Sequence, residues 1–273
     1  MSTTVLAPTT THSATPLAPA RTASARIPLT RIIGVELRKM FDTRAGFWLM
    51  ASIVITSVLA TAALIVFAPD EALTFDNFAA AIGAPMTVIL PMIGILAVTS
   101  EWSQRSGLTT FTLIPHRGRV LVAKLVAALV VGVVAMFVAL VVGTLGTLLG
   151  SAVTGLDPVW NGTVSEFALI VLGSVLGMLF GFMLGVVIRH SAGAIVAYFV
   201  YTLVLPPLLG LLAVNQQWFA DLQPWVDYGF AQTALFNGTM SSEQWQQLAV
   251  SGTLWFLAPM TLGLVLVRRA EVK

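Results

Sequence analysis

Long apolar stretches alternate with short polar segments along most of this chain. Six of these stretches approach the roughly 20 residues that a helix needs to cross the hydrocarbon core of a bilayer. They lie at 47–68, 81–100, 120–149, 165–188, 193–214 and 247–267. The third is longer than one crossing requires, so we expect it either to tilt or to continue into the cytosol. The pattern predicts an all-α membrane protein with six transmembrane helices, residues 47–267 forming the membrane domain.

The segment before the first span divides into two parts. Residues 1–27 are rich in Thr, Ala, Ser and Pro. This composition buries too little apolar surface to offset the entropy of ordering, so we predict a disordered cytoplasmic tail. Residues 28–46 place apolar side chains at helical spacing, with Arg31, Glu36 and Lys39 on the other side. They predict an amphipathic helix in the membrane interface with its polar face in water; a cytoplasmic cap helix is the alternative.

The basic residues predict the orientation. All 14 Lys and Arg residues lie before span one, between spans two and three, between spans four and five, or after span six. The positive-inside rule then places both termini in the cytosol, with the chain in the plasma (inner) membrane and residues 268–273 as a cytoplasmic tail. The outer loops carry acidic residues instead: Asp70, Glu71, Asp76, Asp157, Glu166, Asp221, Asp227 and Glu243.

Composition removes several classes of function. Hydrophobic residues make up 57% of the chain and charged residues only 10%, against roughly 25% charged residues in soluble domains. There is no cysteine, which excludes disulfides and thiol chemistry. No acidic residue, Lys, Arg or His lies near the middle of a predicted span, unlike the pathways of proton-coupled carriers and intramembrane hydrolases. We find no cluster of polar residues at one depth that would mark a membrane enzyme.

Nucleotide and metal sites are also not predicted. The lysines are Lys39, Lys124 and Lys273, and none stands in the Gly-Lys-Ser/Thr setting of a P-loop. The three histidines, His12, His116 and His190, are too scattered for a metal site. We therefore predict no catalytic, cofactor-binding or metal-binding residue. If ATP drives this protein, the ATPase is another chain.

Two features of the later spans concern packing. Gly173, Gly177, Gly181 and Gly185 recur every four residues, on one face along which another helix can approach closely. This glycine face predicts either static packing within one subunit or a contact that slides or forms a dimer. Pro206-Pro207 should break or kink span five, and the aromatic-rich segment 215–246 after it fits short helices that dip back into the membrane or an aromatic belt at the headgroups.

The loop between spans two and three is the longest that we place in the cytosol. Glu101 leaves span two, and Arg105 lies four residues later on the same helical face, so an ion pair is expected. Apolar residues such as Phe111 could fill a groove on a partner, within a helix predicted over Trp102–Thr112. Further basic residues should hold the start of span three at the headgroups: Arg117, Arg119 and Lys124.

This loop resembles a known family. The run Ser100–Lys124, SEWSQRSGLTTFTLIPHRGRVLVAK, looks like the corresponding loop of ABC-2-type permeases, the membrane subunits of type-2 ATP-binding cassette exporters. Shared features are a Glu ending span two, an Arg soon after, a Leu-x-Pro-x-Arg, and an Ala-Lys opening span three. The segment around Glu36-Leu37-x-Lys39 is similar to the family's lead-in to span one. The resemblance covers about residues 30–267.

The resemblance implies a function and partners. In that family this loop is a coupling helix that docks on a cytoplasmic ATPase, which here would involve Glu101, Trp102, Arg105, Leu108, Phe111 and Arg117. ATP and Mg would bind to the ATPase, and this chain would hold no cofactor. Two permeases, as a homodimer or an unlike pair, would form an exporter in the lipid bilayer, with no nucleic-acid partner. The alternatives are a membrane transporter or channel without ATP, and a membrane enzyme or scaffold.

Overall fold

The computed structural model describes residues 27–103 and 117–269, except for the side chains of 101–103, 117, 264 and 266–269. Within this part, all named secondary-structure elements are helices. One isolated parallel β-bridge also occurs, between Thr74 and Val159. The first half contains α1 (Leu29–Asp42), α2 (Arg44–Phe67), η1 (Asp70–Ala72), α3 (Phe75–Ser103) and α5 (Arg117–Thr154). The second half contains α6 (Val164–Ile188), α7 (Ser191–Phe199), η2 (Val200–Val204), α8 (Leu205–Asn215), α9 (Gln217–Val226), α10 (Tyr228–Thr233), η3 (Ala234–Asn237), α11 (Ser242–Gly252), η4 (Thr253–Leu257) and α12 (Ala258–Arg269).

Five helices of the described chain are long and apolar enough to cross a membrane: Arg44–Phe67, Phe75–Ser100, Gly118–Thr154, Val164–Ile188 and Ser191–Asn215. They match the first five predicted spans, and the chain has the architecture of a multi-pass helical membrane protein. The sixth predicted span, 247–267, falls on the consecutive segments α11, η4 and α12, which are not among these five.

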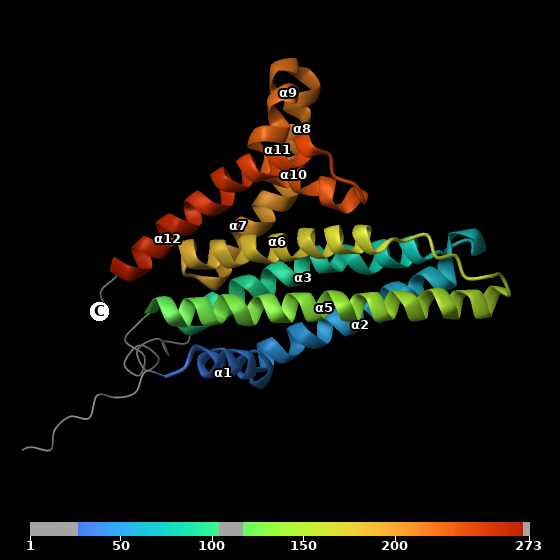
Figure 1. The fold of residues 1–273 in the computed structure, drawn as a ribbon, viewed down its shortest axis with the longest axis horizontal. Coiled ribbons are helices and arrows are strands. Elements are labelled where there is room, and N and C mark those ends of the chain that lie inside the picture. The colour runs from blue at the N-terminus through green and yellow to red at the C-terminus, as the bar shows by residue number, and fades with distance from the viewer. Residues whose placement is uncertain (1–26, 104–116, 270–273) are drawn as a thin grey trace, which may run out of the picture.

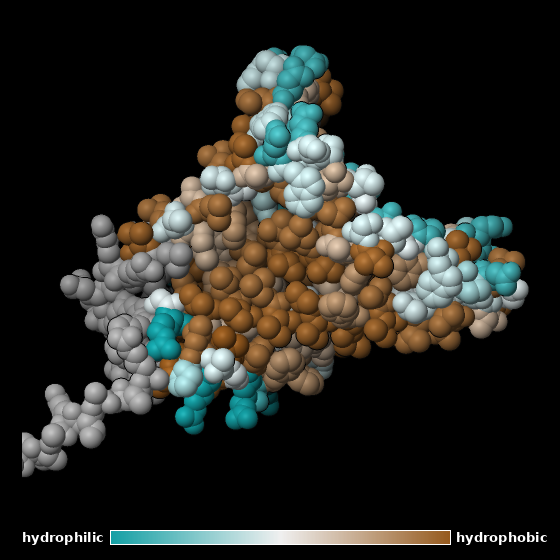
Figure 2. All heavy atoms as spheres, in the orientation of Figure 1, coloured by the Kyte–Doolittle hydropathy of each residue, from teal (hydrophilic) through white to brown (hydrophobic). Residues whose placement is uncertain are grey.

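Four long helices form the body of the molecule. Figure 1 shows α2, α3, α5 and α6 lying side by side, with α1 against one end of this layer. The segments α7–α8 and α12 rise away from the layer and meet the short helices α9–α11 at the top of the view. Figure 2 shows apolar side chains covering the layer, with polar ones gathered over α1, the opposite end and the top. The start of α5, the turn between α6 and α7 and the end of α12 point toward the same end as α1.

Helix α3 is the centre of this body. Over its most apolar stretch 56% of residues are buried, against 6% for the stretch Ser191–Asn215. Phe78, Ile82, Met86 and Leu90 are fully buried at intervals of four residues, so they form one stripe along the helix. The helix packs most extensively on α6 and also on α5 and α2. Movement of α3 would therefore disturb most of the core.

The prolines at 206 and 207 do not end the fifth span. The chain stays helical from Ser191 to Asn215, but the turn before the prolines is a π-helix, in which Leu205 N–H bonds to the Val200 carbonyl. Pro206 and Pro207 then occupy the first turn of α8, where a missing N–H is tolerated. The expected break is therefore replaced by a widened turn at η2. Segment 215–246 does contain short helices, as expected.

Candidate functional site

Along the sequence, the predicted coupling residues run from the last turn of α3 to the start of α5. Glu101 and Trp102 belong to the last turn of α3, and Arg117 begins α5. The side chains of these three residues lie outside the described part of the chain. So do most of the predicted helix Trp102–Thr112 and the whole of Arg105, Leu108 and Phe111. Their roles, and the Glu101–Arg105 ion pair, stay predictions.

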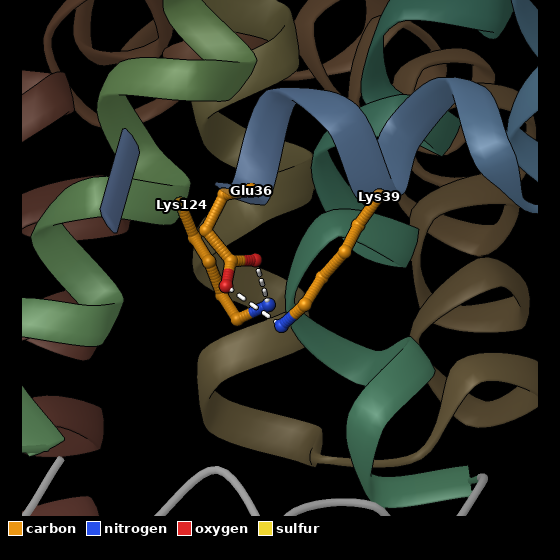
Figure 3. A network of polar contacts seen from close by, with 3 residues as sticks. All are labelled: Glu36, Lys39 and Lys124. Atoms are coloured by element: carbon orange, nitrogen blue, oxygen red, sulfur yellow. Dashed lines mark hydrogen bonds and ion pairs between the residues drawn. The ribbon is translucent and has the colours of Figure 1, made fainter. Parts of the chain in front are cut away.

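A cluster of three charged side chains, two of them buried, lies close to the start of α5. The Glu36 carboxylate on α1 accepts hydrogen bonds from Lys124 on α5 at 2.7 Å and from Lys39 at 2.9 Å, as Figure 3 shows. The side chains of Glu36 and Lys124 are each 5% exposed, whereas that of Lys39 is 43% exposed. This charge cluster, Glu36, Lys39 and Lys124, ties α1 to α5 across 88 positions of sequence.

Two expectations about these residues are wrong. Glu36 does not lie on a wet polar face, and Lys124 does not extend from the surface as an anchor, because α1 packs on α5 and closes over both side chains. Ile32, one helical turn before Glu36, is buried on the same side. In the first turn of α5, Arg119 donates a hydrogen bond to the Ile27 carbonyl at 2.6 Å. The segment Ile27–Glu36 is therefore attached to the first turns of α5 at two points.

The glycine face of α6 packs against other parts of the same chain. A β-carbon at Gly181 would overlap the carbonyl of Pro91 on α3, and one at Gly185 would lie 3.0 Å from the Ile95 carbonyl. At the other end, a β-carbon at Gly173 would lie 2.8 Å from the ring of Phe236. Helix α3 has a glycine at the same contact, because a β-carbon at Gly94 would overlap the Met178 carbonyl on α6. These glycines let the backbones of α3 and α6 approach each other closely.

A cavity of about 380 Å³ lies next to this contact. Its walls come from α3 and α6 on one side and from α7–α8, α9, α10 and η3 on the other. The lining is mainly apolar and includes four aromatic groups close to one another in the fold: Phe180, Tyr201, Phe230 and Phe236. Cavities of this size and character bind drug-sized molecules in many proteins. We call it the aromatic cavity.

One wall of the aromatic cavity carries a buried carboxylate. Asp227 lies between α9 and α10 and is 7% exposed. Its Oδ1 accepts the backbone N–H of Phe230 at 3.1 Å, which caps α10, and its Oδ2 accepts the Gln223 side-chain amide at 3.1 Å. Among the described residues that line the cavity none is Lys, Arg or His. The hydrogen-bond donors to Asp227 are thus neutral N–H groups, whereas those to Glu36 are the charged amines of two lysines.

Two tyrosine hydroxyls near Asp227 are buried in the described structure without a hydrogen-bond partner, those of Tyr201 and Tyr228. Burial raises the pKa of Tyr228 above its usual value. The Tyr201 ring lies 4.3 Å from the Phe180 ring, centroid to centroid. A β-carbon added to Gly229 would lie 3.2 Å from the Tyr201 hydroxyl and 3.4 Å from Asp227 Oδ1. Both oxygens therefore lie close to the backbone of this glycine.

The two π-helical turns meet beside the aromatic cavity. Tyr201 and Thr202 lie on η2 and line it. Trp255 on η4 donates its indole N–H to the Val226 carbonyl at 2.6 Å, and its ring lies 6.3 Å from that of Tyr201. Turns of this kind are frequent at functional sites because they displace side chains from the regular helical position.

The aromatic cavity brings together polar residues that are far apart in the sequence. It gathers polar side chains from five segments, among them Thr87, Ser174, Tyr201, Gln223, Asp227 and Gln232. The sequence contains one signal for this cavity, the acidic residue Asp227 within an aromatic-rich segment. It does not show that Asp227 is buried. No group of three His, Cys, Asp or Glu that could hold a metal occurs in the described chain.

Comparison with known proteins adds no family to this picture. No protein-family model matches the chain, and no curated protein matches it either.

Proposed function

We propose that this chain is the membrane permease subunit of an ABC-type exporter. It crosses the membrane six times, keeps both termini in the cytosol and pairs with a second permease, which is a copy of itself or a related chain. A separate cytoplasmic ATPase docks on the segment between α3 and α5. The permease supplies the membrane pathway, and the ATPase supplies the nucleotide site.

The observation that carries the proposal is the attachment of α1 to the first turns of α5. The Glu36–Lys124 pair joins the two helices, and Arg119 on α5 bonds to Ile27 just before α1, next to the loop that resembles the coupling loop of ABC-2-type permeases. A buried charge pair resists separation, because each charge left alone would be poorly solvated. A push on the loop would then move α1 and α5 as one unit.

A route from this loop to the aromatic cavity supports the same proposal. The loop also follows α3, whose Thr87 and Pro91 line the cavity. Because α3 is held backbone to backbone against α6 at Gly94 and Gly181, displacement along α3 is transmitted to the cavity wall. This contact is a physical connection between the expected ATPase side and a ligand-sized space.

The experiment is affinity purification of the full chain from its native membranes in a mild detergent. ATP hydrolysis in the purified sample and identification of a P-loop ATPase by mass spectrometry are the readouts. We expect both for the wild-type chain and for Phe111→Leu, which keeps an apolar group in the docking loop. Phe111→Asp should lose both, because a carboxylate would be desolvated in an apolar groove.

The contrary result is equally clear. If the wild-type chain is purified without ATP hydrolysis, yet vesicles that contain it alone accumulate a solute, the protein is a transporter or channel that works without ATP. If hydrolysis accompanies both Phe111 variants equally, the loop is not the docking element.

A further inference from the structure

We propose that the aromatic cavity binds a lipophilic organic cation of one positive charge, with Asp227 as its counter-ion. The size of the cavity, the chemistry of its lining and the absence of a basic group from its described lining each support this assignment. Binding rests on the cavity alone; only the view that the bound cation is the exported substrate rests on the proposed function.

The carboxylate provides the charge recognition. Asp227 is held in place by hydrogen bonds from Phe230 N–H and the Gln223 amide, so its negative charge has a fixed position on the cavity wall. Hydrogen bonds to neutral N–H donors stabilise this charge but do not cancel it. With mainly apolar atoms around it, the charge is poorly screened. A cation that enters the cavity therefore gains an attraction that a neutral or anionic molecule of the same shape does not.

The aromatic lining selects an organic cation rather than a metal ion. The faces of aromatic rings attract organic cations, which lose little hydration when they leave water. The rings of Phe180 and Tyr201 lie 4.3 Å apart, centroid to centroid, on the wall, and Phe230 and Phe236 line the same space. Calcium instead takes six to eight oxygen ligands, and the cavity offers one carboxylate.

The unpartnered hydroxyl of Tyr201 adds a polar contact beside the carboxylate. Tyr201 and Asp227 both line the cavity, and the Tyr201 hydroxyl and Asp227 Oδ1 both lie near Gly229, so a ligand that reaches this part of the wall can meet both oxygens. The volume of about 380 Å³ suits a molecule with several rings, at the lower end of the range for drug-sized ligands.

The experiment measures binding of tetraphenylphosphonium to the full chain in lipid nanodiscs, with empty nanodiscs subtracted. Tetraphenylborate has nearly the same shape and the opposite charge, so it separates charge recognition from apolar partition. We expect saturable binding of the phosphonium at one site per chain and no saturable binding of the borate. No ATPase is present, so failure here does not touch the proposed function, nor does failure of the ATPase experiment touch this one.

Two variants place the site. Asp227→Asn keeps an acceptor for the Phe230 N–H, because Asn caps helices as well as Asp does, and should weaken phosphonium binding about tenfold, which corresponds to about 1.4 kcal/mol. Gly210→Leu should abolish binding by filling the cavity, since Gly210 lines it and a β-carbon there meets no atom within 4 Å. Asp221→Asn is the matched control, an exposed carboxylate on α9, and should leave affinity unchanged.

Three outcomes would overturn the inference. They are no saturable binding of the phosphonium above empty nanodiscs, equal binding of phosphonium and borate, and unchanged phosphonium affinity in Asp227→Asn. The near-ultraviolet circular dichroism of each variant shows whether it has kept its tertiary structure, and Asp227→Asn alone decides the question if Gly210→Leu does not fold.

Discussion

Glu36 and Asp227 are both carboxylates buried in a membrane protein, yet their surroundings differ in kind. Glu36 is packed between two helices and accepts hydrogen bonds from Lys39 and Lys124. Asp227 lies on a cavity wall and accepts hydrogen bonds from a backbone N–H and an amide. The partners, more than the burial, separate a charge that holds helices together from one that faces a binding space.

The regions around the two carboxylates differ in the same way. Helix α1 closes over Glu36, and α3, α5 and α6 beside it form a continuous core. The segment Ser191–Asn215, which supplies part of the wall of the aromatic cavity, has only 6% of its most apolar stretch buried. Parts of a protein with few buried contacts open at low free-energy cost. We therefore expect the region of Glu36 to be rigid and that of Asp227 to adapt.

The same substitution at both carboxylates gives the largest expected difference. Glu36→Gln should lower the free energy of unfolding by about 3 kcal/mol, because it weakens the two charge-assisted hydrogen bonds that Glu36 accepts from Lys39 and Lys124. Asp227→Asn should change it by less than about 1 kcal/mol, because the helix cap is retained and the Gln223 amide can turn so that its oxygen accepts from the new Asn amide. Thermal unfolding of the detergent-solubilised chain, followed by near-ultraviolet circular dichroism, measures both. Equal losses in the two variants would mean that Glu36 and Asp227 contribute alike to stability.

The contact between α3 and α6, which lies beside the aromatic cavity, gives the next largest effect. Gly181→Ala should lower stability by about 2 kcal/mol, because its methyl group would overlap the Pro91 carbonyl and force the helices apart. Gly83→Ala on α3 is the control, since a β-carbon there meets nothing within 4 Å. Unfolding by sodium dodecyl sulfate titration compares them. A Gly181→Ala variant as stable as the wild-type chain would mean that α3 and α6 can slide, as a moving seam requires.

Two tyrosines on the fifth span give the smallest effect. Tyr198→Phe should cost about 1 kcal/mol, because the Tyr198 hydroxyl donates to the Thr87 carbonyl. Tyr201→Phe should cost nothing or stabilise slightly, because it removes a buried hydroxyl without a partner. Chemical denaturation of both variants in parallel tests this. A larger loss in Tyr201→Phe would mean that its hydroxyl has a structural partner, and would weaken its assignment to ligand binding.

Several features could be predicted because they depend on neighbours along the chain. Hydropathy over 20 residues is a local property, so five predicted spans match helices long and apolar enough to cross a membrane. Helical spacing similarly indicated α1 and the glycine face of α6. The break suggested by Pro206-Pro207 does not occur, because the chain continues through a π-helical turn, and the hydrogen bonding of one turn depends on how the helix before it continues.

The charged and polar sites could not be predicted, because their partners are distant in sequence. The Glu36–Lys39 spacing was visible, but the burial of Glu36 requires Lys124, 88 residues away. Gln232 donates to the Gly173 carbonyl across 59 residues, and this contact helps to close the aromatic cavity. An acidic residue in an outer loop is by default exposed, and Asp227 is buried only because the short helices fold back onto α6.

The sequence alone thus determined that this is a helical membrane protein and where five of its long apolar helices lie. Those properties follow from the free energy of transfer of each segment into lipid, which is summed residue by residue. Only the tertiary structure decided which carboxylate is paired and which faces a cavity. That choice depends on how helices pack, because the surroundings of a side chain are made by whichever segments come to lie beside it.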